Sequence, residues 1–163
     1  MKLSYAYLSV ILVIALLSCE SKKVSNDQAV DSKGVFQSVI THSAGDSWST
    51  SDEFLPLPMN IGEVNGKEVF LLSDRVKVGK KVGILPLGSV ILIENDSIKT
   101  YVLAIPSVDK NKKIIAEGFD EFSTVYSSAK WIIEQYLVNR KGSNVVKLKS
   151  WENEKTAINY LID

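Results

Sequence analysis

The strongest constraint on the fold lies in residues 74–106, where glycine and proline interrupt long runs of β-prone residues. The stretch DRVKVGKKVGILPLGSVILIE has four of these interruptions at short intervals: Gly79, Gly83, Pro86 and Gly88. Strands interrupted in this way bend sharply, as the strands of a small barrel must. NDS then turns the chain into IKTYVLAIP, so we expect residues 89–106 to form a hairpin that is buried on both faces.

Shorter β-prone runs flank this hairpin, and we expect strands at three more places: residues 35–42, 67–73 and 144–151. The dipeptide Asn65-Gly66 comes directly before the second of these strands. It is the strongest short-range signal for a hairpin turn, because both residues tolerate a positive φ. Prolines and glycines are spread through residues 43–66, so we expect this whole stretch to be loop and turn.

Beyond the hairpin, the spacing of apolar residues changes to three and four. One apolar face predicts a helix over residues 121–139 and consists of Phe122, Tyr126, Ala129, Ile132 or Ile133, and Tyr136 or Leu137. The stretch ENEKTAINYLI, residues 152–162, predicts a short closing helix.

Strands first and helices last predict a mainly β (α+β) fold. We expect a bent five-stranded, OB-like barrel with two C-terminal helices packed against it. In that fold five side chains should be buried: Phe122, Ala129, Ile133, Trp151 and Leu161.

The first 19 residues, MKLSYAYLSVILVIALLSC, have the form of a bacterial secretory signal. The apolar segment at residues 5–17 is shorter than the roughly 20 residues that span a bilayer. Leu16-Leu17-Ser18 before Cys19 resembles a lipoprotein box, in which the cysteine is acylated; the alternative is an ordinary signal with an incidental cysteine. Cys19 is the only cysteine, so no intrachain disulfide can form. We predict a lipoprotein held in a membrane of the bacterial cell envelope, facing the periplasm or the surface.

The predicted organisation is a signal peptide at residues 1–18, a tether at residues 19–34 and one domain at residues 35–163. The tether is polar and cannot bury enough apolar surface to order itself. The chain has 19 basic and 19 acidic residues, so it lacks the basic surplus with which proteins bind nucleic acid.

Four motifs follow one another along the predicted domain: Leu57-Pro58-Met59-Asn60-Ile61-Gly62, Pro86-Leu87-Gly88, Leu103-Ala104-Ile105-Pro106 and Ser150-Trp151. In order and spacing they resemble the Tyr-Pro-x-Asn-Tyr-Gly, Pro-(Ile/Val)-Gly, Ala-Val-Pro and Gly-Trp motifs of the soluble inorganic pyrophosphatases. This resemblance covers about residues 35–162. It implies the fold of that family, diphosphate as the substrate, and hydrolysis to two phosphates with several Mg²⁺ ions as cofactors.

The resemblance also implies that most metal and phosphate ligands of the family are absent here. Its ligand positions fall on these residues: Asn65, Lys67 and Phe70 for three aspartates, Glu94 and Asn95 for an acidic pair, and Lys99 and Tyr101 for a later Asp and Lys. The first three positions carry a formal charge of +1, where three aspartates would carry −3. Since each unit of charge at ~4 Å is worth roughly 1–4 kcal/mol, we expect this pocket to hold divalent cations poorly.

Three residues keep a usable polar group at a family position. Glu94 and Tyr136 are the candidate catalytic remnants, and Glu94 with Asn65 is the candidate metal-binding pair. Glu94 is alternatively a solvated residue beside a turn, and Tyr136 a core residue. His42, the only histidine, is expected at the end of an edge strand, solvated or hydrogen-bonded rather than acting as a base. A rearranged metal site stays open for four carboxylates: Glu63, Glu68, Asp74 and Glu94.

The sequence leaves three interpretations of the protein open. The first is a membrane-tethered pyrophosphatase that is weak or inactive because its ligands are degenerate. The second is a non-catalytic binding or scaffold lipoprotein on the same barrel, favoured by the apolar residues Leu57, Ile61, Phe70 and Leu137 at former polar positions. The third is an unrelated small β-barrel lipoprotein, which would be favoured if the C-terminal helices did not pack on the barrel.

Overall fold

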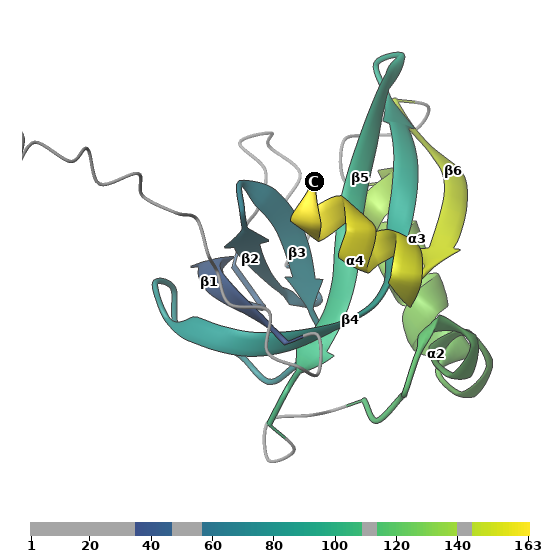
Figure 1. Cartoon of the computed structure of the whole chain (residues 1–163). Coiled ribbons are helices and arrows are strands. Elements are labelled where there is room, and N and C mark those ends of the chain that lie inside the picture. Colours follow the sequence, from purple (N-terminus) through teal and green to yellow (C-terminus); the bar gives the residue numbers. More distant parts are fainter. Residues whose placement is uncertain (1–34, 47–56, 109–113, 140–144) are drawn as a thin grey trace, which may run out of the picture.

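The computed structural model describes residues 35–46, 57–108, 114–139 and 145–163. Within these ranges the chain forms six strands and three helices (Figure 1). In chain order they are β1 (Phe36–His42), β2 (Asn60–Val64), β3 (Lys67–Leu71), β4 (Lys81–Glu94), β5 (Ser97–Pro106), α2 (Phe119–Val125), α3 (Ser127–Asn139), β6 (Val146–Asn153) and α4 (Glu154–Ile162). Cys19 and the predicted signal and tether lie outside the described residues.

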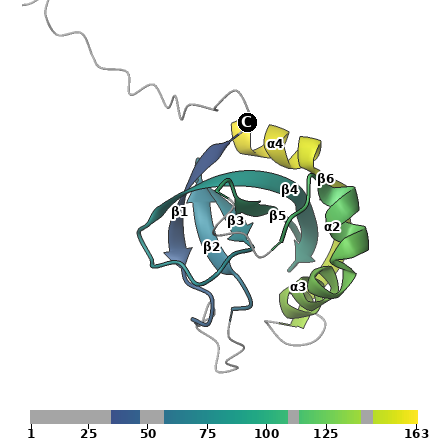
Figure 2. The same ribbon diagram turned by 90° about the horizontal axis from the view of Figure 1, so that it is seen from below.

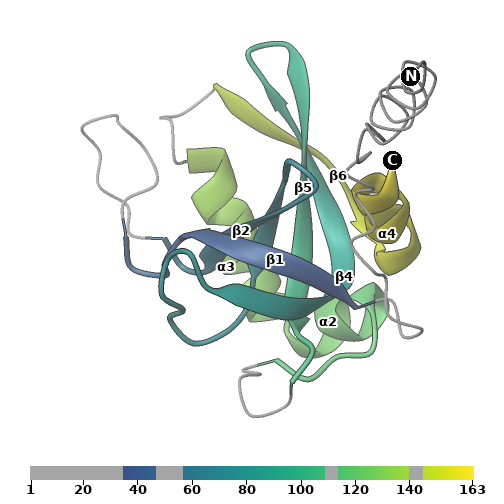
Figure 3. The ribbon, with the colours of Figure 1, turned by 60° about the vertical axis from the view of Figure 1, so that its left-hand side comes forward.

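Five of the strands close into a ring. The sheet order is β1-β2-β3-β5-β4-β6, and β4 also pairs with β1, which closes the first five strands into a barrel. Figure 2 shows this ring with the helices outside it, and Figure 3 shows β1 beside the first part of β4. The prediction of a bent five-stranded barrel with helices packed against it is therefore confirmed.

Strand β4 makes this closure possible because it bends. Its first residues pair with β1, and its later residues pair with β6. The pairing with β5 shifts register between Pro86 and Gly88. A Cβ atom at Gly88 would lie 2.6 Å from the carbonyl oxygen of Glu152 and 2.8 Å from the Phe119 ring. Only glycine fits there, which explains the glycine after the proline in this motif.

Two tight turns set the hairpins. Asn65 and Gly66 have φ of 52° and 75° between β2 and β3, and Asn95 and Asp96 have φ of 49° and 62° between β4 and β5. Two consecutive residues with positive φ are typical of a type I′ turn, whose twist matches that of paired strands. Both hairpins predicted from the sequence are therefore present.

Two predictions about elements are wrong in part. Strand β2 lies inside residues 43–66, which were expected to be loop, because its five residues reach the sheet despite the prolines before it. The helix expected over residues 121–139 is two helices, broken at Tyr126, which has φ of −111° and ψ of 35°. The Tyr126 hydroxyl lies 3.2 Å from the backbone nitrogen of Ile115 and accepts its hydrogen bond.

Apolar side chains pack on both sides of the central strands. Phe70 and Leu103 belong to a cluster that α2 and α3 cover, while their strand neighbours Val69 and Val102 belong to a second cluster with α4. Successive side chains of a strand point to opposite faces, so both faces of β3 and β5 are covered. Phe122, Ile133 and Leu161 are buried as predicted, whereas Ala129 and Trp151 are only partly buried at the edge of the first cluster.

Candidate functional site

The first two family aspartate positions lie in the β2–β3 hairpin and contact the end of helix α4. The Asn65 side-chain amide donates a hydrogen bond to the carbonyl oxygen of Leu161 over 3.0 Å. The Lys67 amino group donates to the carbonyl oxygen of Tyr160 and lies 4.8 Å from the centre of the Tyr160 ring. The last carbonyls of a helix lack partners within the helix and carry partial negative charge. Asn65 and Lys67 therefore stabilise this helix end.

The third aspartate position, Phe70, lies on the other face of β3. Its side chain is 1% exposed, and its ring stacks on that of Tyr101, with ring centres 4.9 Å apart and planes 11° from parallel. Tyr101, at the position of a family lysine, is itself buried. Two positions that carry charge in the family thus hold a stacked aromatic pair in the cluster under α2 and α3.

The remaining positions of the β4–β5 hairpin divide between surface and interior. Asn95 lies in the turn and Lys99 on β5, and both are exposed. Glu94 is buried at 7% exposure, so the alternative of a solvated Glu94 is wrong. Glu94 lies two residues beyond Leu92 on the same strand, hence on the face of the first cluster.

Tyr136 lies on α3, where it is partly buried and packs against the first cluster. Leu57 and Ile61, at the positions of two family tyrosines, are buried in the same cluster.

The structure does not gather the predicted ligands in one place. Asn65 reaches toward α4, whereas Glu94 and Phe70 lie on the opposite face under α2 and α3. Glu63 and Glu68 face each other across β2 and β3 and are exposed. In the four ranges that the structure describes, no three His, Cys, Asp or Glu side chains are placed to hold a metal ion together.

Among the described residues, the side chains at the positions matched by resemblance do not fit a multi-metal centre. Mg²⁺ requires an octahedron of oxygen ligands, normally carboxylates and water. These positions offer one carboxylate, Glu94, while Asn65 and Lys67 bind a helix end and Phe70 and Tyr101 form a stacked pair. The remaining two, Asn95 and Lys99, are an exposed amide and an exposed ammonium group.

His42 lies at the end of β1, where its ring is 3.2 Å from the Thr41 hydroxyl. This contact agrees with the hydrogen-bonded position expected from the sequence. The expectation of an edge strand is wrong, because β1 pairs with both β2 and β4 when the barrel closes.

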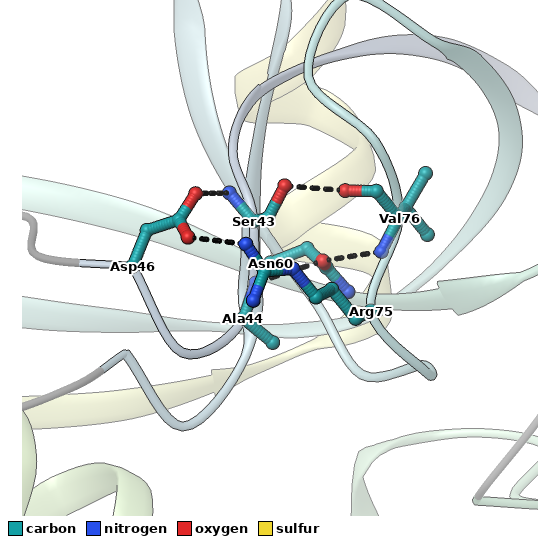
Figure 4. A network of polar contacts seen from close by, with 6 residues as sticks. All are labelled: Ser43, Ala44, Asp46, Asn60, Arg75 and Val76. Carbon is teal, nitrogen blue, oxygen red and sulfur yellow. Dashed lines mark hydrogen bonds and ion pairs between the residues drawn. The ribbon is translucent and has the colours of Figure 1, made fainter.

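Asn60, from the first motif, is a structural centre that sequence reasoning missed (Figure 4). Its side-chain oxygen accepts hydrogen bonds from the backbone nitrogens of Ala44 at 3.0 Å and Val76 at 2.9 Å. Its amide nitrogen donates to the Ser73 hydroxyl at 3.0 Å and to the Asp74 carbonyl at 2.9 Å. The side-chain amide is fully buried, and both of its N–H donors have an acceptor. It thereby fixes the loop after β1 against the loop after β3.

An ion pair reinforces the contact between these two loops. The Arg75 guanidinium lies 2.6 Å from an Asp46 carboxylate oxygen, and the other Asp46 oxygen accepts a hydrogen bond from the backbone nitrogen of Ser43. The Ser43 hydroxyl donates in turn to the Val76 carbonyl over 2.6 Å.

A cavity of about 460 Å³, open to solvent and with a mixed polar and apolar lining, lies between these loops and helix α3. Its lining includes Leu72, Ile114 and Ile133, together with Arg75. This volume is within the range of small-molecule sites.

In the described ranges, no helix is both long and apolar enough to cross a bilayer.

Comparison with solved structures identifies the fold. The chain superimposes on inorganic pyrophosphatases from Coxiella burnetii (TM-score 0.64, 18% identity, 78% of this chain and 91% of that chain), Helicobacter pylori (0.63, 19%, 78% and 89%) and Thermus thermophilus (0.64, 16%, 81% and 90%). No protein-family model matches the chain, and no curated protein sequence matches it. At these identities the likeness establishes the barrel fold.

Proposed function

We propose that this chain is a membrane-tethered lipoprotein of the bacterial cell envelope whose pyrophosphatase-fold domain has little or no diphosphatase activity. The domain then serves as a non-catalytic module. Its tether is the acylated Cys19, as the sequence predicts.

The stacked pair Phe70 and Tyr101 is the observation that carries this proposal. Hydrolysis of diphosphate needs metal ions that neutralise the substrate and lower the pKa of the attacking water. An aromatic ring supplies neither a negative charge nor an oxygen ligand for such an ion. The resemblance matches Phe70 to a family aspartate, and the burial of Phe70 in the core supports the proposal that this position holds no metal ion.

The contacts of Asn65 and Lys67 also support the proposal that the domain has little or no diphosphatase activity. Their polar groups bind the carbonyls at the end of α4, so neither is available to an ion elsewhere. The lysine also brings a positive charge to a position where the family has an aspartate.

Phosphate release tests the proposal. The full chain, purified in a neutral detergent, is incubated with diphosphate and Mg²⁺ or Mn²⁺, and free phosphate is measured over time. We expect release at the rate of the protein-free control. Robust release that requires the metal and rises with protein concentration would refute the proposal, and variants of Glu63, Glu68 and Glu94 would then locate the rearranged site.

The 460 Å³ cavity favours a second candidate function, the binding of a small apolar molecule. Leu72, Ile114 and Ile133 supply apolar surface, and Arg75, which pairs with Asp46 outside the lining, supplies a polar group. Substitution of Ile133 by a polar residue of similar volume would test this function by the loss of binding of an apolar fluorescent probe.

A further inference from the structure

A second cavity, of about 290 Å³, lies at the loop between β3 and β4. Four cationic side chains line it: Arg75, Lys77, Lys80 and Lys81. Asp74 is the single carboxylate among its lining residues. The whole chain has equal numbers of acidic and basic residues, so this cluster is a local excess of positive charge and not part of a basic surface.

Among the described residues, the three lysines of this cavity form no ion pair with a carboxylate. Arg75 is paired with Asp46, but in the described part of the chain no ion pair or hydrogen bond engages the amino groups of Lys77, Lys80 or Lys81. All three are exposed. Water and salt screen the repulsion between exposed charges, but three positive charges around one cavity still attract an anion.

The backbone holds the lysines in place. The nitrogen of Lys80 donates to the carbonyl of Lys77 at 3.2 Å, and Gly79 between them has φ of 82°. Two hydrogen bonds join this turn to β1. The Gly79 nitrogen donates to the Ile40 carbonyl at 2.8 Å, and the Ile40 nitrogen donates to the Lys80 carbonyl at 3.0 Å. The other wall begins at Val76, which Asn60 anchors at 2.9 Å. The backbone that carries Lys77 and Lys80 is thus held by hydrogen bonds to neighbouring segments.

We propose that this cavity, hereafter the lysine pocket, binds a phosphate-type anion. Lysine binds phosphate as a point charge. Three positive charges match a phosphate dianion better than they match a ligand with the single negative charge of a carboxylate. The cavity volume is at the lower end of the range for ligand sites, so it suits a single phosphoryl group with a small substituent. None of its lining residues belongs to the ligand positions inferred from the pyrophosphatase resemblance.

The phosphoryl group has two possible sources, a free phosphate compound or the headgroup of an anionic lipid. The second source rests on the proposed anchor at Cys19, whereas the pocket itself does not. Val35, where the described domain begins, lies beside Gly83 of the pocket, since a Cβ on Gly83 would be 3.5 Å from a Val35 methyl group. Residues 20–34 span at most about 50 Å when extended. A membrane holding Cys19 would therefore be within reach of the pocket.

Titration of the full chain in neutral detergent, followed by backbone NMR, tests the proposal. The probes are inorganic phosphate, short-chain phosphatidylglycerol and short-chain phosphatidylcholine. We expect saturable shifts confined to residues 75–83, and dissociation constants at least tenfold weaker in the triple variant Lys77→Gln, Lys80→Gln, Lys81→Gln. The matched control, Lys147→Gln, Lys149→Gln, Lys155→Gln, removes the same charge from β6 and α4 and should change them less than twofold.

The two sources give different results. Tighter binding of phosphatidylglycerol than of phosphate, lost in the pocket variant, identifies a lipid headgroup; binding of phosphate alone identifies a soluble anion. Absence of saturable binding, shifts elsewhere, or equal weakening in both triple variants would overturn the proposal. The single variant Lys80→Gln serves as a second test if the triple variant unfolds. Binding is read without turnover, so diphosphatase activity would contradict the proposed function and leave this result unaffected.

Discussion

At the scale of single residues, the positions that resemble metal ligands have structural partners. Asn65 and Lys67 bind the end of α4, and Phe70 stacks on Tyr101 in the core. The sequence predicts by resemblance that these positions match metal ligands of the pyrophosphatases. Their new contacts could not, because they join residues that lie more than 90 positions apart in the chain for Asn65 and Lys67.

Restoring an aspartate at position 70 should damage the fold rather than recover a metal site. Phe70→Asp would place a carboxylate in a fully buried apolar cluster, and a buried charge without a partner is costly. We expect the free energy of unfolding to fall by at least the roughly 3–5 kcal/mol of a Phe→Ala change in a core. Urea unfolding measures it.

The control for this variant is Phe70→Leu, which keeps the site apolar and should cost on the order of 1 kcal/mol. Equal stability of the aspartate variant and the parent, with or without Mg²⁺, would contradict the buried, stacked position of Phe70.

The contact between Lys67 and helix α4 makes a second prediction. Lys67→Met keeps the apolar stem but removes the charge at the helix end, so the free energy of unfolding should fall by about 1 kcal/mol. Lys99→Met removes a charge from an exposed position on β5 and should change it by less than about 0.5 kcal/mol. If denaturant melts gave the two variants the same stability, Lys67 would have no role in holding α4.

At the scale of elements, hairpins were easier to predict than strand ends or helix breaks. Asn65-Gly66 predicts its turn because both residues take positive φ, as observed. Strand β2 was missed because the prolines before it are typical of loops, while its pairing depends on distant β1 and β3. The helix breaks at Tyr126, where the hydroxyl also contacts Ile115, and apolar spacing reveals neither feature.

The Asn60 network should dominate the stability of the loops that it joins. Asn60→Ala would leave the backbone nitrogens of Ala44 and Val76 without their acceptor, so we expect a loss on the order of 3 kcal/mol. Asn159→Ala, on an exposed part of α4, should be neutral or slightly stabilising. Thermal melts compare the two, and amide exchange at Val76 should accelerate only in the Asn60 variant. Unchanged exchange at Val76 would rule out this role.

At the scale of the whole molecule, one chain combines a predicted lipid anchor with a barrel covered on both sides. Helices α2 and α3 cover one apolar cluster and α4 contributes to the other. The long apolar runs of β4 and β5 predicted this burial on both faces. Sequence spacing alone could not show whether Asn65 and Glu94, the predicted metal pair, lie close together. They belong to two different hairpins, and their side chains reach opposite faces of the sheet.

The anchor makes a prediction about processing in the cell. The parent chain should be acylated at Cys19 and partition into the detergent phase, because two or more acyl chains hold a protein in a membrane. Cys19→Ala should leave an uncleaved or soluble species, while Ser25→Ala should mature as the parent does. Normal maturation and detergent partitioning of the Cys19 variant would show that the anchor is elsewhere.

The proposed function requires that the positions matched to family aspartates hold structural contacts and no metal ion. Titration of Mn²⁺ into the full chain, with free Mn²⁺ measured by electron paramagnetic resonance, tests this requirement, because Mn²⁺ uses the same oxygen ligands as Mg²⁺. We predict that the signal of free Mn²⁺ stays equal to that of buffer with detergent alone up to a few equivalents per chain. A saturable loss of that signal, removed by Glu94→Gln, would contradict the proposed function and establish a divalent metal site in this barrel.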